Sequence, residues 1–270
     1  MKSGSFLKHI SDDWQGCRNL STYIFLLTLF SMLGTQKPCL AFSELTDSDK
    51  QYQQAKTYEE LEKVAKNIRT LLQAKPNQPE WEWRLARSHY SLAKHTDSEN
   101  LKYHHFTQCI ERSSRSLVTQ PDSAIGYFYR ALCRGKQGEM EGIWASLEVI
   151  EPFEMDMKQA LQLDPGIQHG GPLRALGNFY LELPFFLGGN LDQSVYYLEE
   201  AVRLAPDFAE NHWGLARAYY AQHNFKSAQN SLLILMRLTD KIEEGEGLFD
   251  IRTQAQALMK KLASLVSDTL

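Results

Sequence analysis

A helix-ending pattern that recurs four times constrains this chain more than any other feature. Each copy is a short, mostly apolar stretch that stops at a proline. The copies are LLQAKP at 71–76, LVTQP at 117–121, LQLDP at 161–165 and VRLAP at 202–206. Successive prolines lie 45, 44 and 41 residues apart. A period in this range is typical of stacked helical repeats, which usually present a binding surface rather than a catalytic centre.

Composition supports an all-α repeat protein. Of the 270 residues, 43% are hydrophobic and 23% are charged, which is enough apolar material for a core. Helix formers dominate from residue 45 onward, and no run of alternating β-branched residues predicts a strand. The net charge of −4 excludes a phosphate-tracking surface, so nucleic acid is not an expected partner.

The first 41 residues have the features of an export signal. An apolar run at Tyr23–Gly34 follows basic residues and precedes Cys39-Leu40-Ala41. Small residues three and one before a cut suit a signal peptidase, so we expect cleavage after Ala41 and a periplasmic protein. The alternative is an uncleaved anchor, but twelve helical residues rise only about 18 Å against a bilayer core of about 30 Å. No lipoprotein motif precedes a cysteine, and membrane attachment stays open.

Residues 42–270 predict a single helical domain, a superhelical stack of tetratricopeptide-like helix pairs with about ten helices. We expect a flexible start at 42–50 and a final helix at 251–267 that caps the stack. Caps, prolines and apolar periodicity place the other helices. They are expected at 57–74 and 80–95, from a cap at Asp97 or Ser98 to 119, from a cap at Asp122 or Ser123 to 135–138, and at 142–163, 172–187, 191–204, 208–222 and 225–238.

Two cysteines remain beyond the predicted signal. Cys109 lies twelve residues before Pro121, and Cys133 lies twelve residues after it. If Pro121 marks the turn of an antiparallel helix pair, both thiols sit at the same height above that turn. An oxidising compartment then allows a disulfide. The alternative is two buried free thiols that pack as small hydrophobes.

Small residues and chain breaks organise the stretch from 170 to 206. Gly170-Gly171 followed by Pro172 predicts the end of one helix and the start of the next, because no strand precedes it and no Gly-Lys-Ser/Thr follows it as in a phosphate loop. Small side chains elsewhere let neighbouring helices approach closely. The residues to which we give such structural roles are Gly170, Gly171, Pro172, Gly177, Gly188, Gly189, Ala201 and Pro206.

The helix pair at 208–238 resembles a tetratricopeptide repeat, and the longer units before it resemble a particular family. Gly170-Gly171-Pro172-x-Arg174-x-Leu176-Gly177-x-x-Tyr180, then Gly188-Gly189-Asn190 and Leu198-Glu199-x-Ala201, is similar to the TatT family, the T component associated with TRAP transporters. The resemblance implies an exported α-helical protein that associates with a periplasmic solute-binding protein. It also implies that some members form symmetric oligomers with an apolar channel in each subunit. A related family of eukaryotic microtubule-dynamics regulators shares the architecture, but the export leader favours a bacterial envelope.

Several side chains in this region are candidates for contact with a partner or ligand. Arg174 has two interpretations: it contacts a carboxylate or a partner protein, or it pairs internally with Glu182 or Asp164. The apolar Pro184-Phe185-Phe186 run at a helix end either packs under a neighbouring repeat or contacts a partner or ligand. The candidate residues are Arg174, Tyr180, Pro184, Phe185 and Phe186.

These features predict a binding protein rather than an enzyme. No His or Cys residues have metal-ligand spacing, no Ser-His-Asp group has supporting context, and no cofactor motif is found in the sequence. We expect an accessory component of a TRAP-type system that docks a solute-binding protein or holds an apolar or organic-anion ligand, with homo-oligomers allowed. The alternative is a general envelope scaffold that binds a protein or peptide in its concave groove.

Overall fold

The computed structural model describes residues 38–240 and 246–267, and this part of the chain is α-helical without a strand. The all-α prediction is therefore confirmed. The helices are α1 (Pro38–Gln54), α2 (Tyr58–Ala74), α3 (Pro79–Lys94), α4 (Glu99–Thr119), α5 (Ala124–Glu141), α6 (Ile143–Leu163), α7 (Ile167–Glu182), a short 3-10 helix η1 (Phe185–Leu187), α8 (Leu191–Leu204), α9 (Ala209–Ala221), α10 (Phe225–Thr239) and α11 (Glu246–Ser267).

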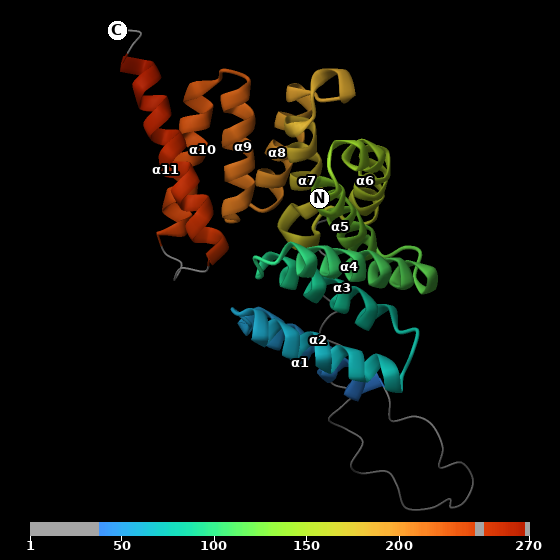
Figure 1. The fold of residues 1–270 in the computed structure, drawn as a ribbon. Helices are drawn as coiled ribbons and strands as arrows, with labels where there is room; N and C mark the ends of the chain where they lie inside the picture. Colours follow the sequence, from blue (N-terminus) through green and yellow to red (C-terminus); the bar gives the residue numbers. More distant parts are fainter. Residues whose placement is uncertain (1–37, 241–245, 268–270) are drawn as a thin grey trace, which may run out of the picture. The chain divides into compact units, whose positions relative to one another are not determined.

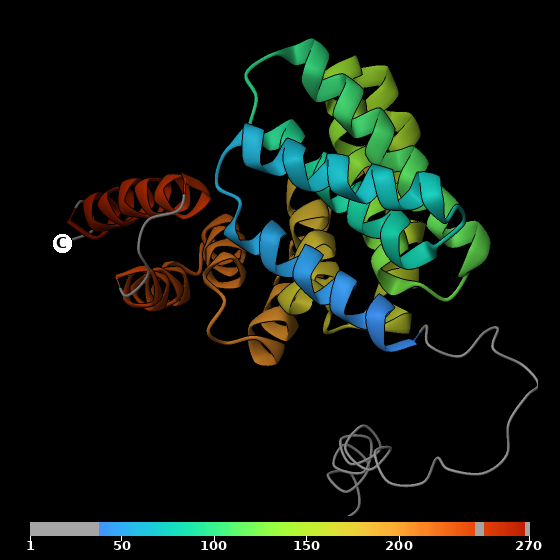
Figure 2. The same cartoon turned by 90° about the horizontal axis from the view of Figure 1, so that it is seen from below.

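The unit formed by residues 44–270 is a stack of helix pairs (Figures 1 and 2). Each of α3, α5, α7 and α9 packs against the helix that follows it, and these four first helices also contact one another in succession. The last helix, α11, lies against α10 and α9 and closes the stack, as predicted for 251–267. The tetratricopeptide-like superhelical architecture is confirmed.

The predicted signal peptide falls almost wholly outside the described residues, so export and cleavage stay predictions. The flexible start expected at 42–50 is wrong, because α1 covers it. Asp49 accepts hydrogen bonds from Arg84 at 2.7 Å and from Arg87 at 2.6 Å, and both arginines lie on α3. These tertiary contacts stabilise a helix that local sequence alone does not favour. No helix in the described part is both long and apolar enough to cross a membrane.

The junctions between helices are set by side-chain caps. Thr57 forms a capping box with Glu60 at the start of α2, which satisfies two backbone N–H groups. Ser98 and Ser123 cap α4 and α5, and Asn190 caps α8. Each cap fixes where a helix begins, so the short turns between paired helices are determined by local sequence.

Close approach of α7, α8 and α9 depends on two glycines around one leucine. A Cβ added at Gly177 would lie 2.4 Å from the Leu198 side chain, and one added at Gly214 would lie 2.6 Å from it. Leu198 is fully buried between them. The small residue predicted at Gly177 therefore serves close helix contact, as the sequence indicates.

A disulfide joins two of the helix pairs. Cys109 on α4 and Cys133 on α5 are bonded, with 6.2 Å between their Cα atoms, and both residues are fully buried. The bond crosses the contact between the pair α3–α4 and the pair α5–α6. It therefore links two repeats rather than closing one.

We expect reduction of this disulfide to lower the free energy of unfolding by about 3 kcal/mol, because opening a loop of this length releases denatured-state entropy. Urea unfolding with and without dithiothreitol measures the change. The Cys109→Ala/Cys133→Ala double variant is the control, since it should be insensitive to the reductant. Two free thiols in the air-oxidised, folded protein would contradict the pairing.

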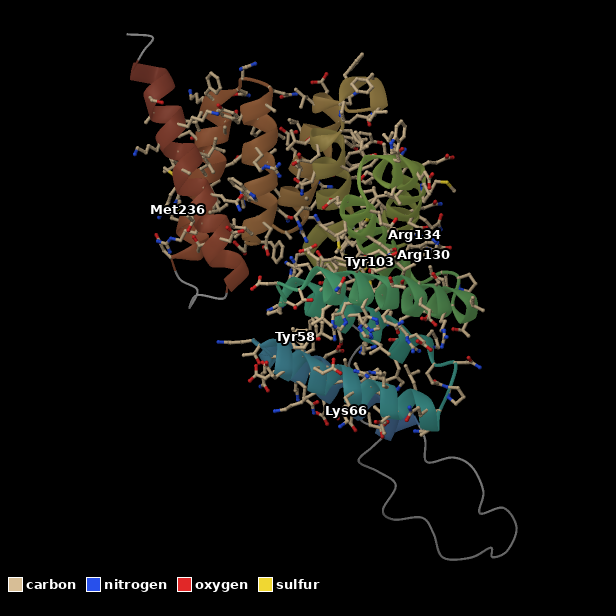
Figure 3. The ribbon with its side chains drawn as sticks, viewed as in Figure 1. Tyr58, Lys66, Tyr103, Arg130, Arg134 and Met236 are labelled. Carbon is tan, nitrogen blue, oxygen red and sulfur yellow. A yellow bond between two sulfur atoms is a disulfide. The ribbon has the colours of Figure 1, made fainter. Side chains whose placement is uncertain are left out.

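A histidine pair is buried between α2, α3 and α4. The Nδ1 atoms of His89 and His105 lie 3.0 Å apart, and the Tyr58 hydroxyl is 2.9 Å from Nε2 of His105 (Tyr58 is labelled in Figure 3). Two facing Nδ1 atoms at this distance need one N–H and one lone pair, so at least one of the two rings is neutral. Burial, followed by the nearby His105 and Arg69, lowers the pKa of His89 to about 3.

This pair predicts a loss of stability in mild acid. The pKa of His89 is depressed on folding, so the unfolded chain binds more protons below its own pKa of about 6.5. Stability is therefore complete above that pH and falls as the pH drops toward 3, by about 2 kcal/mol between pH 6.5 and pH 5.

Urea midpoints measured across this range should show the decrease. A His89→Gln variant should show a flatter pH profile, whereas His223→Gln, at an exposed turn, should behave as the parent chain. The same slope in His89→Gln and in the parent chain would contradict the assignment.

Candidate functional site

An apolar cleft lies between α5, α6 and α7. Its volume is about 520 Å³, and its floor includes Phe153 and Phe179, whose rings stack with centroids 4.9 Å apart. The other apolar residues of the cleft come from the same three helices and are Leu132, Val149, Ile150, Ala175 and Leu183. A cleft of this size and lining fits one or two large apolar side chains.

The charges at the mouth of the cleft are paired. Lys136 forms an ion pair with Glu139 at 2.7 Å, and Arg217 of α9 forms one with Glu182 of α7. The Oδ1 atom of Asn178, which also lines the cleft, is buried and has no hydrogen-bond partner among the described residues. The residues at the mouth thus carry little net charge.

Large apolar side chains stand exposed beside this cleft. Ile143 and Trp144, at the turn from α5 to α6, are 72% and 79% exposed. Phe185 and Phe186 of η1, at the turn from α7 to α8, are 91% and 82% exposed. These four residues form what we call the apolar edge.

The cleft continues toward the Phe185 part of the apolar edge. Leu183 lines both the cleft and a second hollow of about 930 Å³, and Phe185 lines that second hollow as well. Of the two interpretations of the Pro184-Phe185-Phe186 run, burial under a neighbouring repeat is wrong: all three residues are exposed. The insertion between α7 and α8 presents its phenylalanines to solvent instead.

Tyr180, one of the predicted contact residues, packs inside the helix stack. Its ring is buried and stacks on Tyr197 at 5.7 Å, and its hydroxyl donates to Glu154. Burial, with the bond to Glu154, raises the pKa of Tyr180 to about 12. The side chain therefore joins α6, α7 and α8, and only its edge reaches the second hollow.

Arg174 pairs with neither acid expected for it. Glu182 binds Arg217 instead, and Asp164 accepts from the backbone of Gly166. The Arg174 guanidinium lies 4.8 Å from the ring centroid of Phe208. It donates to the side chain of Asn211 at 2.8 Å and to the backbone carbonyls of Gln168 and His169, near the start of α7.

Those carbonyls belong to a left-handed turn. Gln168, His169 and Gly170 all have positive φ values of 49°, 57° and 76°. Positive φ strains residues with a side chain, so two of the three need tertiary support. Glycine is favoured at 170 because its φ of +76° lies in the left-handed region.

The support for this turn comes from Asn211 at the start of α9. Its fully buried amide nitrogen donates to the carbonyl of His169 at 3.1 Å and to those of Ala201 and Ala205 at the end of α8. The His169 ring also stacks on Phe208 at 4.5 Å. One side chain thus ties the beginning of α7 to the end of α8.

The remaining predicted structural residues lie at contacts or turns. A Cβ at Gly171 would lie 2.8 Å from the Phe128 ring, and one at Gly189 would clash with the carbonyl of Leu183. Gly188 has a φ of +99° and ends η1. Pro172 is buried, and Pro206 follows the end of α8, where its carbonyl lies 2.7 Å from the His212 ring.

A family model matches residues 45–179, which is half of the 270-residue chain, and its description is regulator of microtubule dynamics protein 1-3. The chain belongs to this family. A bovine member (Bos taurus), regulator of microtubule dynamics protein 1, is 24% identical over 193 residues. That match covers 66% of the present chain but only 60% of the bovine protein.

The family match and the fold comparisons agree on the architecture. A tetratricopeptide repeat model matches residues 186–241. A thermophilic tetratricopeptide protein of Thermus thermophilus has a TM-score of 0.59 at 17% identity, over 80% of this chain and 97% of its own. The assembly chaperone of RpL4 has a TM-score of 0.51 at 15% identity, over 82% and 84% of the two chains. These matches do not show the TatT family, so the transport role implied by that resemblance stays a prediction.

Sequence reasoning missed some of the residues on which the site depends. Asn211 and Phe208 gave no signal, because a single Asn in the first turn of a helix is usually exposed. The positive φ of Gln168 and His169 was also hidden, since neither residue type marks a left-handed turn. Trp144, which is 79% exposed, was not among the candidate residues.

We expect Asn211→Ala to destabilise the fold by about 2–4 kcal/mol, because it removes several buried hydrogen bonds and leaves carbonyls unsatisfied. Chemical denaturation measures the loss, and heteronuclear NMR of residues 167–171 should report rearrangement of the turn. The control is Asn190→Ala, which removes an exposed helix cap and should cost only about 1 kcal/mol. Equal losses in the two variants would show that Asn211 does not hold the turn.

Proposed function

We propose that this protein is a non-catalytic scaffold that binds an apolar segment of a partner protein in the cleft and along the apolar edge. The observation that carries this proposal is that the cleft continues toward the Phe185 part of the apolar edge. An apolar cleft between three helices opens beside four large apolar side chains that are at least 72% exposed. Contiguous exposed apolar groups of this kind mark interaction sites in soluble proteins.

The chemistry of the cleft favours a polypeptide segment. The paired charges at its mouth do not select for a charged ligand. Apolar side chains of that segment would fill the cleft while its flanks cover Trp144 and Phe185, and the energy would come mostly from apolar burial.

The fold supports a binding role in general terms. Tetratricopeptide-like stacks are repeat architectures that present extended binding surfaces, and they are generally not catalytic. The assembly chaperone of RpL4, with which this chain shares its fold, acts on another protein according to its description. No group of three or more His, Cys, Asp or Glu residues in the described part could hold a metal ion.

We also propose that the protein works in an oxidising compartment. The buried disulfide between Cys109 and Cys133 supports this, because such bonds rarely persist in the cytosol. The apolar run at Tyr23–Gly34, which has the features of an export signal, supports it as well. In a bacterial envelope, a solute-binding protein of a TRAP system would be one partner of the proposed kind. The general scaffold remains our main proposal, because its support does not depend on the TatT resemblance.

The experiment selects phage-displayed random dodecapeptides against the folded chain. We expect enriched peptides to carry two or more large apolar residues. Ala175→Trp, which fills the cleft, and Phe185→Ser/Phe186→Ser should each weaken their binding at least tenfold, or about 1.4 kcal/mol. The matched control is Val118→Ser, which changes an 82% exposed apolar side chain outside both hollows.

Fluorescence anisotropy with the selected peptides gives the affinities, and circular dichroism checks that each variant folds. Peptides without apolar enrichment, or affinities unchanged in both site variants, would refute the proposal. Co-sedimentation with polymerised tubulin tests the role that the bovine relative's name describes. Tubulin binding that survives both site variants would place that activity outside the cleft and the apolar edge.

A further inference from the structure

Arg174 is a largely buried cation without a counter-charge. The other shielded arginines, Arg84, Arg87 and Arg130, each form an ion pair with a carboxylate at 2.6–2.7 Å. No described carboxylate forms an ion pair with Arg174, and Glu210 is the nearby acid that acts on it electrostatically. A buried charge without compensation is costly, so this arrangement needs an explanation.

One edge of this guanidinium is available for a ligand. Nη1 makes the bond to Asn211 and two longer ones to backbone carbonyls, whereas Nη2 makes only a 3.4 Å contact with the carbonyl of Gln168. Nε makes no hydrogen bond to a described residue, and it is not buried. The Nε–Nη2 edge is the one that binds a carboxylate through two parallel hydrogen bonds.

Two tyrosines lie within electrostatic range of this guanidinium. Tyr90 of α3 and Tyr129 of α5 have ring centroids 6.0 Å apart, and both interact electrostatically with Arg174 of α7. Their hydroxyls make no hydrogen bond to a described residue, although Tyr129 is only 4% exposed, and neither oxygen is fully buried. Two tyrosine hydroxyls and the Nε–Nη2 edge of one guanidinium, on three successive first helices, are thus not saturated by hydrogen bonds within the described residues.

From this juxtaposition we propose that Arg174, Tyr90 and Tyr129 form a binding site for a carboxylate group. The guanidinium edge binds the two carboxylate oxygens, and the tyrosine hydroxyls donate to them. This site is independent of the apolar cleft, whose lining includes none of the three residues. Asn211 and Phe208 hold the guanidinium in place from its other side.

The charge balance selects a monoanion. Of the three groups only Arg174 is charged, and Glu210 opposes a second negative charge. Asp49, the acid that acts on Tyr129, is already neutralised by Arg84 and Arg87. A planar carboxylate therefore fits better than a phosphate dianion. The carboxylate can belong to a free organic acid or to the C-terminus of a polypeptide.

The test titrates the folded chain with three probes: propionate, acetyl-tetraalanine with a free carboxylate, and the same peptide as an amide. The signal is the NMR shift of the Arg174 Nε–H group together with calorimetry. We expect at least one carboxylate to bind and the amide not to bind. If propionate binds with the same affinity as acetyl-tetraalanine, the ligand is a free organic acid. If acetyl-tetraalanine binds at least tenfold more tightly than propionate, the ligand is the C-terminus of a polypeptide.

Variants separate binding from folding. Arg174→Gln should lower the affinity at least tenfold, and Arg174→Lys should lower it less because the charge remains. Arg174 also supports the left-handed turn, so its variants can lose affinity through a change of structure. The double variant Tyr90→Phe/Tyr129→Phe removes only two hydroxyls, and it should lower the affinity three- to tenfold while the protein stays folded. The controls are Arg203→Gln, an exposed arginine, and Tyr196→Phe, whose hydroxyl is on an exposed side chain. Absence of carboxylate binding, or unchanged affinity in both tyrosine and arginine variants, would overturn the proposal.

Discussion

The buried amide of Asn211 holds together the part of the fold on which both proposed sites depend. It joins the left-handed turn at 168–170 to the end of α8, and it fixes Arg174 through its oxygen. The position of α7 follows from this connection together with the packing of Leu198 between Gly177 and Gly214. Since α7 supplies Ala175, Asn178 and Phe179 to the cleft, the cleft depends on it as well.

Charge compensation distinguishes the structural parts of the stack from the parts available for binding. Asp156 on α6 accepts from both Arg130 and Arg134 on α5 (both arginines are labelled in Figure 3), and Asp49 does the same for two arginines of α3. In these clusters every charge has a partner, so they stabilise packing between helices. Arg174 lacks such a partner, which is why we assign it to a ligand rather than to the core.

Sequence reasoning was most successful where the fold rests on local rules. The proline-ended apolar repeats and the caps at Ser98 and Ser123 predict most of the helices, because each signal acts within a few residues. The start of the fold could not be predicted in this way. Helix α1 depends on hydrogen bonds from Arg84 and Arg87, 35 and 38 residues away, to Asp49. The local composition around Asp49 does not predict these long-range contacts.

The candidate sites could be predicted in part, for the same physical reason. An arginine near Pro172 and a Pro-Phe-Phe run are unusual in their local context, so they were recognised as candidates, but their partners were not. Arg174 binds Asn211, 37 residues away, rather than the nearby acids. Phe185 and Phe186 lie in the short helix η1, which ends at Gly188 in a left-handed conformation. The local sequence does not reveal that this turn exposes the two phenylalanines.

The apolar edge is difficult to explain by stability alone. Phe185 and Phe186 contribute almost nothing to the core at 91% and 82% exposure, and Ile143 and Trp144 are in the same position one repeat earlier. Exposed apolar groups add a risk of aggregation, whereas polar residues would serve equally well in turns that need only a cap and a glycine. Exposed apolar side chains thus stand at two turns in successive repeats, and the second turn lies next to the cleft through Leu183. A partner that covers the edge while it fills the cleft accounts for all three features together.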